Sequence, residues 1–173
     1  MKSAIFVAFL FSFTGVLSCA AQSDSHGSSD LVWYTELAKA QEASNKSNKP
    51  IFGFFTGSDW CGWCHKLQAD VFAKDAFKEW AKKNVILLEL DFPRRKQLPN
   101  DIAQQNMSLQ QAFQVSGYPT IWMFFAETDP KTSRVNLNAL GSTGYPAGAE
   151  RGKEEVKFLN DANAILANGK KKG

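Results

Sequence analysis

The sequence predicts an α/β domain in which a mixed central β-sheet is flanked by helices on both faces. Three short apolar segments (51–55, 85–90 and 120–125) have the length and composition of buried strands. Helical segments with one apolar face separate them along the chain. With 173 residues, 44% of them hydrophobic and 21% charged, the chain is also long enough to bury the core of one globular domain.

The first half of the domain is predicted to alternate between helix and strand. Its expected elements are a helix over 31–45 capped by Asp30, a strand over 51–55 opened by Pro50, a turn over 56–59, a helix over 61–72, a helix over 75–83 and a strand over 85–90. Trp33, Leu37 and Ala40 are expected to lie on the buried face of the first helix. Because helices separate the strands, neighbouring strands are expected to be parallel and joined by right-handed crossovers.

The second half is predicted to close the sheet with an antiparallel hairpin and a final helix. Its expected elements are a polar, basic connection over 91–99, a helix from Asn100 that Gly117 ends, a strand over 120–125, a turn over 128–130, an edge strand over 135–140 and a helix over 149–166. The short turn makes the last two strands antiparallel. The expected inward side chains are Ile102, Leu109 and Phe113 in one helix, and Val156, Leu159, Ala162, Ile165 and Leu166 in the other.

Residues 1–19 have the features of a signal peptide. Lys2 precedes an apolar core over 5–17 that is too short for a comfortable membrane span. Two alternatives remain open: cleavage within Ser18-Cys19-Ala20, or lipidation of Cys19 in a bacterial lipoprotein box. Residues 20–30 are rich in Ser, Asp and Gly and are expected to be a flexible tether. The protein is therefore predicted to be exported, either periplasmic or anchored to the envelope through Cys19.

The cysteine count indicates a chemical role for one pair. The chain has three cysteines, and removal or lipidation of Cys19 leaves Cys61 and Cys64 in the mature domain. A disulfide that closes such a short loop stabilises a fold very little. The pair is therefore expected to be reactive.

The predicted position of the pair gives its two cysteines different roles. Cys61 lies at the start of a helix, where unpaired N–H groups and the positive end of the helix dipole favour a thiolate. Cys64 lies one turn later and shares a face with Leu67 and Val71, so it is expected to be shielded. We therefore expect Cys61 to be the nucleophile and Cys64 to resolve the mixed disulfide.

Neighbouring residues are expected to bind a peptide. Gly62 leaves the approach to Cys61 open, and Trp60 and Trp63 would form an apolar rim. Two alternatives remain for His65: a cation that modulates the thiolate or its proton transfer, or a helix residue that faces solvent.

Two separated motifs resemble signatures of the thioredoxin-like superfamily. Phe-Phe-Thr-Gly-Ser-Asp-Trp-Cys-Gly-Trp-Cys-His, over 54–65, resembles its active-site segment, and Gly-Tyr-Pro-Thr, over 117–120, resembles its second signature. The resemblance implies a thioredoxin fold over 31–168, followed by a basic tail over 169–173. It also implies that Pro119 is cis and that Tyr118 offers its backbone to a substrate strand.

The resemblance, which is strongest to exported bacterial members of the family, implies a thiol–disulfide oxidoreductase. Such a protein would reduce or isomerise disulfides in exported proteins through a mixed disulfide, with reduction as our working hypothesis. Its redox-active disulfide would need no cofactor or metal. The expected partners are disulfide-bearing exported proteins and a membrane electron donor. The net charge of +3 gives no indication of nucleic-acid binding, and a single domain favours a monomer.

The sequence departs from the family pattern at two places. Many members carry a buried acid six residues before the first cysteine, where this chain has Phe55. Glu89 is either a substitute proton acceptor or a strand residue that faces solvent. The segment over 91–106 also looks longer than in plain thioredoxin, and it is either a partner-specific surface or a neutral insertion.

Three other kinds of site are alternatives for the cysteine motif. Cys-Gly-Trp-Cys-His also fits covalent haem attachment in an electron-transfer protein, with His65 as the proximal ligand and Met107 or Met123 as the distal one. A non-catalytic binding domain could retain an inert disulfide. A structural zinc site needs four ligands, and the mature chain offers only its two cysteines and two histidines, one of them in the tether.

Overall fold

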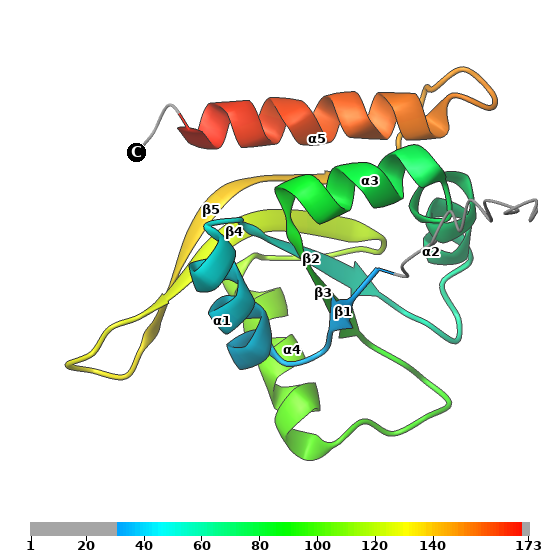
Figure 1. Cartoon of the computed structure of the whole chain (residues 1–173). Coiled ribbons are helices and arrows are strands. Elements are labelled where there is room, and N and C mark those ends of the chain that lie inside the picture. The colour runs from blue at the N-terminus through cyan, green and yellow to red at the C-terminus, as the bar shows by residue number, and fades with distance from the viewer. Residues whose placement is uncertain (1–30, 171–173) are drawn as a thin grey trace, which may run out of the picture.

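The computed structural model describes residues 31–170 and has a mixed five-stranded sheet with helices on both faces (Figure 1). The elements are β1 (Trp33–Tyr34), α1 (Leu37–Ser47), β2 (Ile51–Thr56), α2 (Gly62–Leu67), the π-helical turn η1 (Gln68–Phe72), α3 (Asp75–Asn84), β3 (Ile86–Asp91), α4 (Asn100–Ala112), β4 (Thr120–Thr128), β5 (Val135–Gly144) and α5 (Glu154–Lys170). The predicted signal peptide, the tether with Asp30 and the last three residues of the basic tail lie outside the described part.

The strand order β1-β3-β2-β4-β5 brings three loops together at one end of the strands. β1, β3 and β2 are parallel, and β4 runs antiparallel to both β2 and β5. In this register Thr56 at the end of β2 pairs with Asp91 at the end of β3, and Phe55 pairs with Thr120 at the start of β4. The segments over 57–61, 92–99 and 117–119 therefore leave or enter the sheet side by side.

Alternation along the strands divides the core between the two faces of the sheet. Phe52 and Phe54 of β2 lie in one cluster with both predicted redox cysteines and with side chains of α3 and α5. Ile51 and Phe55 lie in the other cluster, with side chains of α1 and α4. Each face is therefore covered by helices, as the predicted fold class requires (Figure 1).

The N-terminal segment differs from the prediction. Instead of one helix over 31–45, Trp33 and Tyr34 form a short strand beside Leu87 and Leu88, and α1 begins only at Leu37. The Trp33 ring packs against three phenylalanine rings of the core, with centroid distances of 5.6 to 6.2 Å. Pairing with the exposed edge of β3 and burial of this ring outweigh the local helical pattern.

The C-terminal helix also differs in its bounds and its buried face. It begins at Glu154 rather than near residue 149, and it continues through Lys170, two residues into the predicted basic tail. Val156 was expected to face inward but is 54% exposed, whereas Phe158 and Ala162 are fully buried. Because helical neighbours recur every three or four residues, a face centred on Phe158 and Ala162 turns Val156 to solvent. Over residues 31–170, no helix combines the length and apolarity needed to cross a bilayer.

Candidate active site

Cys61 and Cys64 form a disulfide at the start of α2, with Cα atoms 5.2 Å apart. Cys61 has an extended backbone and caps the helix, and its Sγ accepts a hydrogen bond from the Cys64 N–H at 3.2 Å. An N–H group directed at sulfur stabilises negative charge on it. The structure therefore places Cys61 where the sequence predicted a favoured thiolate.

The two sulfur-bearing residues differ in their surroundings. Cys64 is fully buried beside Leu67 and Val71, as the shared helical face predicted. Cys61 is 5% exposed in the disulfide form. Gly62 is exposed, and apart from its chain neighbours and the backbone of its own helix no atom lies within 4 Å of the position that a Cβ would take there. The surface beside Cys61 is therefore open at Gly62, while Cys61 itself is largely covered in the disulfide form.

Tyr118 and Pro119 lie in the loop directly before β4, and the peptide bond between them is cis, as the resemblance implied. Tyr118 packs against the core cluster that contains the disulfide. Its hydroxyl accepts a hydrogen bond from Gln110 Nε2 at 2.6 Å, and burial raises the pKa of the phenol. The carbonyl oxygen of Pro119 lies 3.1 Å from the position of a Cβ on Gly144, so a side chain there would crowd this turn.

Trp60 joins the cysteine segment to the connection after β3. Its indole N–H donates to the carbonyl oxygen of Phe92 at 2.8 Å. Its ring meets Tyr118 edge to face, with centroids 5.7 Å apart, and the guanidinium of Arg94 lies 3.7 Å from a ring centroid of Trp60. Phe92 also packs on Tyr118, with centroids 5.3 Å apart. The three loops are thus held together by one aromatic cluster.

Trp63 has a different environment on the other side of Cys61. Its side chain is 59% exposed and rests on Tyr145, with ring centroids 5.0 Å apart. The Tyr145 hydroxyl donates to Asp70 at 2.7 Å, and Lys66 forms an ion pair with the same carboxylate at 2.6 Å. The hydrogen bond from Lys66, with that from Tyr145, lowers the pKa of Asp70.

Asp91, almost fully buried at the end of β3, fixes the loop before the cysteines. Its carboxylate accepts hydrogen bonds from the N–H and the hydroxyl of Ser58 at 2.8 and 2.6 Å, and it pairs with Lys96 at 2.9 Å. The Ser58 carbonyl lies 2.8 Å from His65 Nε2. Since a carbonyl can only accept, this nitrogen must carry the proton. His65 is exposed, yet its ring is tied to the cysteine loop.

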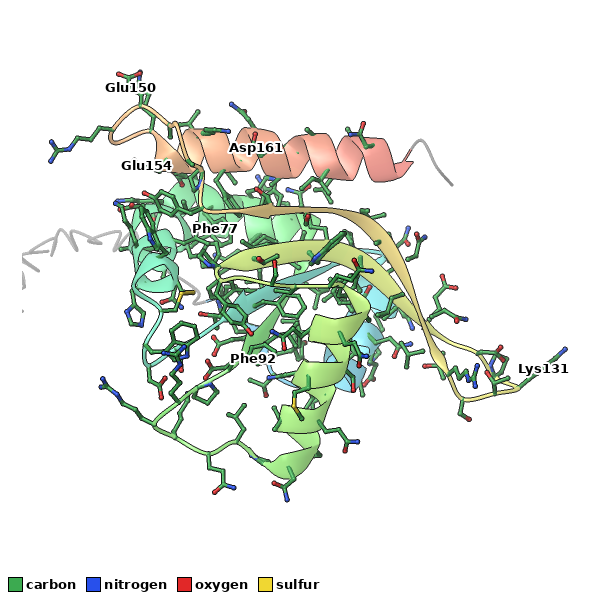
Figure 2. All side chains as sticks on the ribbon, turned by 180° about the vertical axis from the view of Figure 1, so that it is seen from behind. Phe77, Phe92, Lys131, Glu150, Glu154 and Asp161 are labelled. Carbon is green, nitrogen blue, oxygen red and sulfur yellow. A yellow bond between two sulfur atoms is a disulfide. The ribbon has the colours of Figure 1, made fainter. Side chains whose placement is uncertain are left out.

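Asp59 fixes the connection over 92–99 in the same way (Figure 2 shows Phe92, where this connection begins). Its carboxylate accepts the backbone N–H of Arg94 at 3.0 and 3.2 Å and that of Arg95 at 2.7 Å. These hydrogen bonds, that from Arg94 above all, lower the pKa of Asp59. Two aspartates thus bind the cysteine segment to the following crossover.

The position six residues before Cys61 belongs to the other face of the sheet. Phe55 is fully buried in the cluster opposite the cysteines, where it packs against Phe92 and Phe113. Glu89 is half-buried on β3, and burial, followed by the charge of Asp91, raises its pKa. It is therefore neither freely solvated nor, among the described residues, hydrogen-bonded to a cysteine.

The sequence did not identify Ser58, Asp59, Asp91, Arg94 or Tyr145 as part of the site. Asp91 carried one signal, because an acid that ends an apolar strand needs a partner.

The haem alternative finds no support in this arrangement. His65 Nε2 bonds to Ser58, Met123 is fully buried in β4, and Met107 is 57% exposed on α4. Within residues 31–170, no cluster of three or more His, Cys, Asp or Glu is placed to hold a metal ion.

Comparisons with known proteins agree with this geometry. A thioredoxin-like domain family matches residues 37–134. Disulfide bond reductase DsbH of Chlamydia pneumoniae is 34% identical over 116 residues, which cover 67% of this chain and 69% of that protein. Thioredoxin-related protein DsbJ of the same organism is 23% identical over 144 residues, which cover 83% of this chain but only 39% of DsbJ.

Solved structures show the same architecture. The structure of a DsbH oxidoreductase matches with a TM-score of 0.64 and 26% identity, over 93% of this chain and 95% of that one. A thioredoxin from Thermus thermophilus matches with a TM-score of 0.52 and 14% identity, over 80% and 89% of the two chains. The thioredoxin fold expected from the two motifs is thereby confirmed, and the chain belongs to the thioredoxin-like family.

Proposed function

We propose that this protein is a thiol–disulfide oxidoreductase that reduces or isomerises disulfides in exported proteins, with Cys61 as nucleophile and Cys64 as resolving cysteine. The observation that carries the proposal is the Cys61–Cys64 disulfide at the start of α2, with a backbone N–H directed at the outer sulfur. The likeness to a protein named disulfide bond reductase favours the reducing direction.

The proposed reaction begins with the dithiol form. The Cys61 thiolate attacks one sulfur of a substrate disulfide, the substrate S–S bond breaks, and the departing thiolate takes up a proton. The Cys64 thiol then loses its proton and attacks Cys61 Sγ. This step forms the Cys61–Cys64 disulfide and releases the second substrate sulfur as a thiolate. Two electrons pass to the substrate, and a dithiol donor must return them to this protein.

The surrounding residues support these steps. The Cys64 N–H stabilises charge on Cys61 Sγ, and Cys61 is the more accessible cysteine, at 5% exposure against 0% for Cys64. Gly62 keeps the approach open, and Trp63 offers an apolar surface to a peptide. His65, held by Ser58, is proposed to modulate the thiolate when its ring is protonated. Trp60, Tyr118 and Pro119 are proposed to form the other side of the peptide site, with the Tyr118 backbone pairing with the substrate.

The proposed setting follows from the N-terminal sequence. A signal peptide over 1–19 would export the chain, and lipidation of Cys19 would anchor it to the envelope. Its partners would be exported proteins with disulfides and a membrane electron donor, and the domain would act as a monomer. Mass spectrometry of the protein isolated from its native membranes and periplasm would distinguish cleavage from lipidation.

The experiment that tests the assignment is mixed-disulfide trapping. Cys64→Ser, reduced and mixed with a disulfide-bonded peptide, should accumulate a covalent adduct through Cys61, because the resolving thiol is absent. Cys61→Ser is the matched control and should trap none, since Cys64 is buried. Equal trapping by both variants would contradict the assigned roles.

The reduction potential tests the direction. A value near −270 mV in defined thiol buffers, as for thioredoxin, would support a reductase. A value near about −120 mV would identify an oxidant and reverse the proposed direction.

A further inference from the structure

We propose that the connection between β3 and α4 is a docking element for acidic segments of substrate proteins, with Arg94 and Arg95 as its recognition residues. This inference rests on the proposed function and adds a substrate class to it. Neither the two cysteines nor the family motifs account for this segment, which lies over residues 92–99.

The connection is anchored against the redox site. Asp59, two residues before Cys61, accepts the backbone N–H groups of both arginines. At the start of the segment, Phe92 accepts a hydrogen bond from Trp60 and packs on Tyr118. A segment held at both of these points has less conformational freedom to lose when a partner binds.

These contacts with Asp59 use only the backbone N–H groups of the two arginines, and the Arg94 guanidinium stacks on the Trp60 ring without a carboxylate partner among the described residues. The carboxylate of Asp59 is directed to backbone N–H groups, and that of Asp91 is taken by Ser58 and Lys96. Within residues 31–170, neither Arg94 nor Arg95 has a carboxylate within ion-pair distance, and both side chains are exposed. Lys96, by contrast, forms an ion pair with Asp91.

The position of these charges matches a substrate that reaches Cys61. Arg94 lies on the ring of Trp60, the residue directly before Cys61. On the other side of the disulfide, Lys66 is already paired with Asp70, and the exposed surface is the apolar ring of Trp63. Arginine presents a planar fork that binds carboxylates in a bidentate manner. The site therefore favours substrates with acidic residues on the Trp60 side of their disulfide.

The test compares peptides that differ only in charge. Three disulfide-bonded peptides carry two Asp, two Ser or two Lys residues beside the same cysteine, and the rate constant for their reduction by the dithiol protein is measured at low and high salt. We expect the acidic peptide to react about fivefold faster than the basic one at low salt, with the ratio falling as salt screens the charges.

Charge reversal of the connection provides the decisive variant. In R94E/R95E the ratio of acidic to basic rates should fall below one, and in R94Q/R95Q it should approach one. The matched control is K131E/R134E, which makes the same charge change at the exposed tip of the β4–β5 hairpin, remote from Phe92 in Figure 2. Circular dichroism and the urea midpoint confirm that each variant is folded.

Each outcome is decisive. A ratio that is near one in the wild type, unchanged in R94Q/R95Q, or changed equally by K131E/R134E would overturn the docking proposal while leaving the oxidoreductase intact. Failure of the wild-type dithiol to reduce any of the three peptides would instead overturn the proposed function.

Discussion

Trp60 and Trp63 flank the same cysteine but have opposite environments. Trp60 is held by a hydrogen bond to Phe92, an edge-to-face contact with Tyr118 and the guanidinium of Arg94. The Trp63 ring packs against Tyr145, and more than half of the side chain is exposed to solvent. From the sequence both were expected to form one apolar rim. In the structure Trp60 connects the loops around Cys61, whereas the Trp63 side chain is 59% exposed.

The difference shows how one segment can be both ordered and accessible. Loop residues need partners beyond their own backbone, and those before Cys61 find them in the connection after β3. The residues after Cys61 are ordered by α2 itself. The Trp63 side chain makes no hydrogen bond to the loop before Cys61 among the described residues, and it is 59% exposed.

The largest effect that separates the two sides is expected from removing each indole. Trp60→Ala should lower the free energy of unfolding by about 2 to 3 kcal/mol, because it loses a hydrogen bond and several aromatic contacts. Trp63→Ala should cost only about 0.5 kcal/mol, since that ring is largely exposed, yet slow the reduction of peptide disulfides several-fold. Urea denaturation and peptide kinetics measure the two effects. Equal destabilisation by both variants would contradict the expectation that Trp60, and not Trp63, supports the fold.

Two glycines give a second test of intermediate size. A Cβ on Gly57 would lie 2.5 Å from Nε1 of Trp60, whereas one on Gly62 would meet nothing. Because the Trp60 ring is fixed by its partners, Gly57→Ala should destabilise the fold by about 1 to 3 kcal/mol. Gly62→Ala should be neutral or stabilising by about 0.5 kcal/mol, as alanine favours the helix. Thermal unfolding of both variants decides, and an unchanged melting temperature for Gly57→Ala would show that the indole is mobile.

The residues that could be predicted share a local signature. The strand-to-helix position of Cys61 and Cys64, the inward face of Cys64 with Leu67, and the order of the elements all follow from short-range periodicity. The aspartate contacts do not. Asp91 meets Ser58 across 33 residues, and Asp59 meets Arg95 across 36, so no window of sequence reveals them.

The errors have the same origin. The segment over 33–34 has a helical pattern, but the free edge of β3 recruits it into the sheet. In α5, Glu155 accepts the N–H of Phe77 on α3 at 2.9 Å, and Phe158 enters the core between the same helices. These contacts fix the rotation of α5 and turn Val156 outward. Rotation about a helix axis depends on the neighbour as much as on the helix.

The smallest expected effect comes from the carboxylates that support each side. Hydrogen bonds hold the pKa of Asp59 and of Asp70 below the ordinary value of 3.8. A lowered pKa in the folded state adds stability that is fully present above the ordinary value and is lost as the pH falls through the folded pKa. Asp59→Asn and Asp70→Asn should therefore be less stable than the wild type near neutral pH, and each difference should shrink in acid.

The two asparagine variants should differ in what they release. Loss of the Asp59 contacts frees the backbone of Arg94 and Arg95, so amide exchange over 92–99 should rise in Asp59→Asn, and in the wild type as Asp59 is protonated. Loss of the Asp70 contacts frees Tyr145 beneath Trp63, so exchange over 92–99 should stay at the wild-type level in Asp70→Asn. Equal loosening of this connection in both variants would mean that the two sides of Cys61 unfold together, and the distinction between a tied tryptophan and a free one would not extend to the loops that carry them.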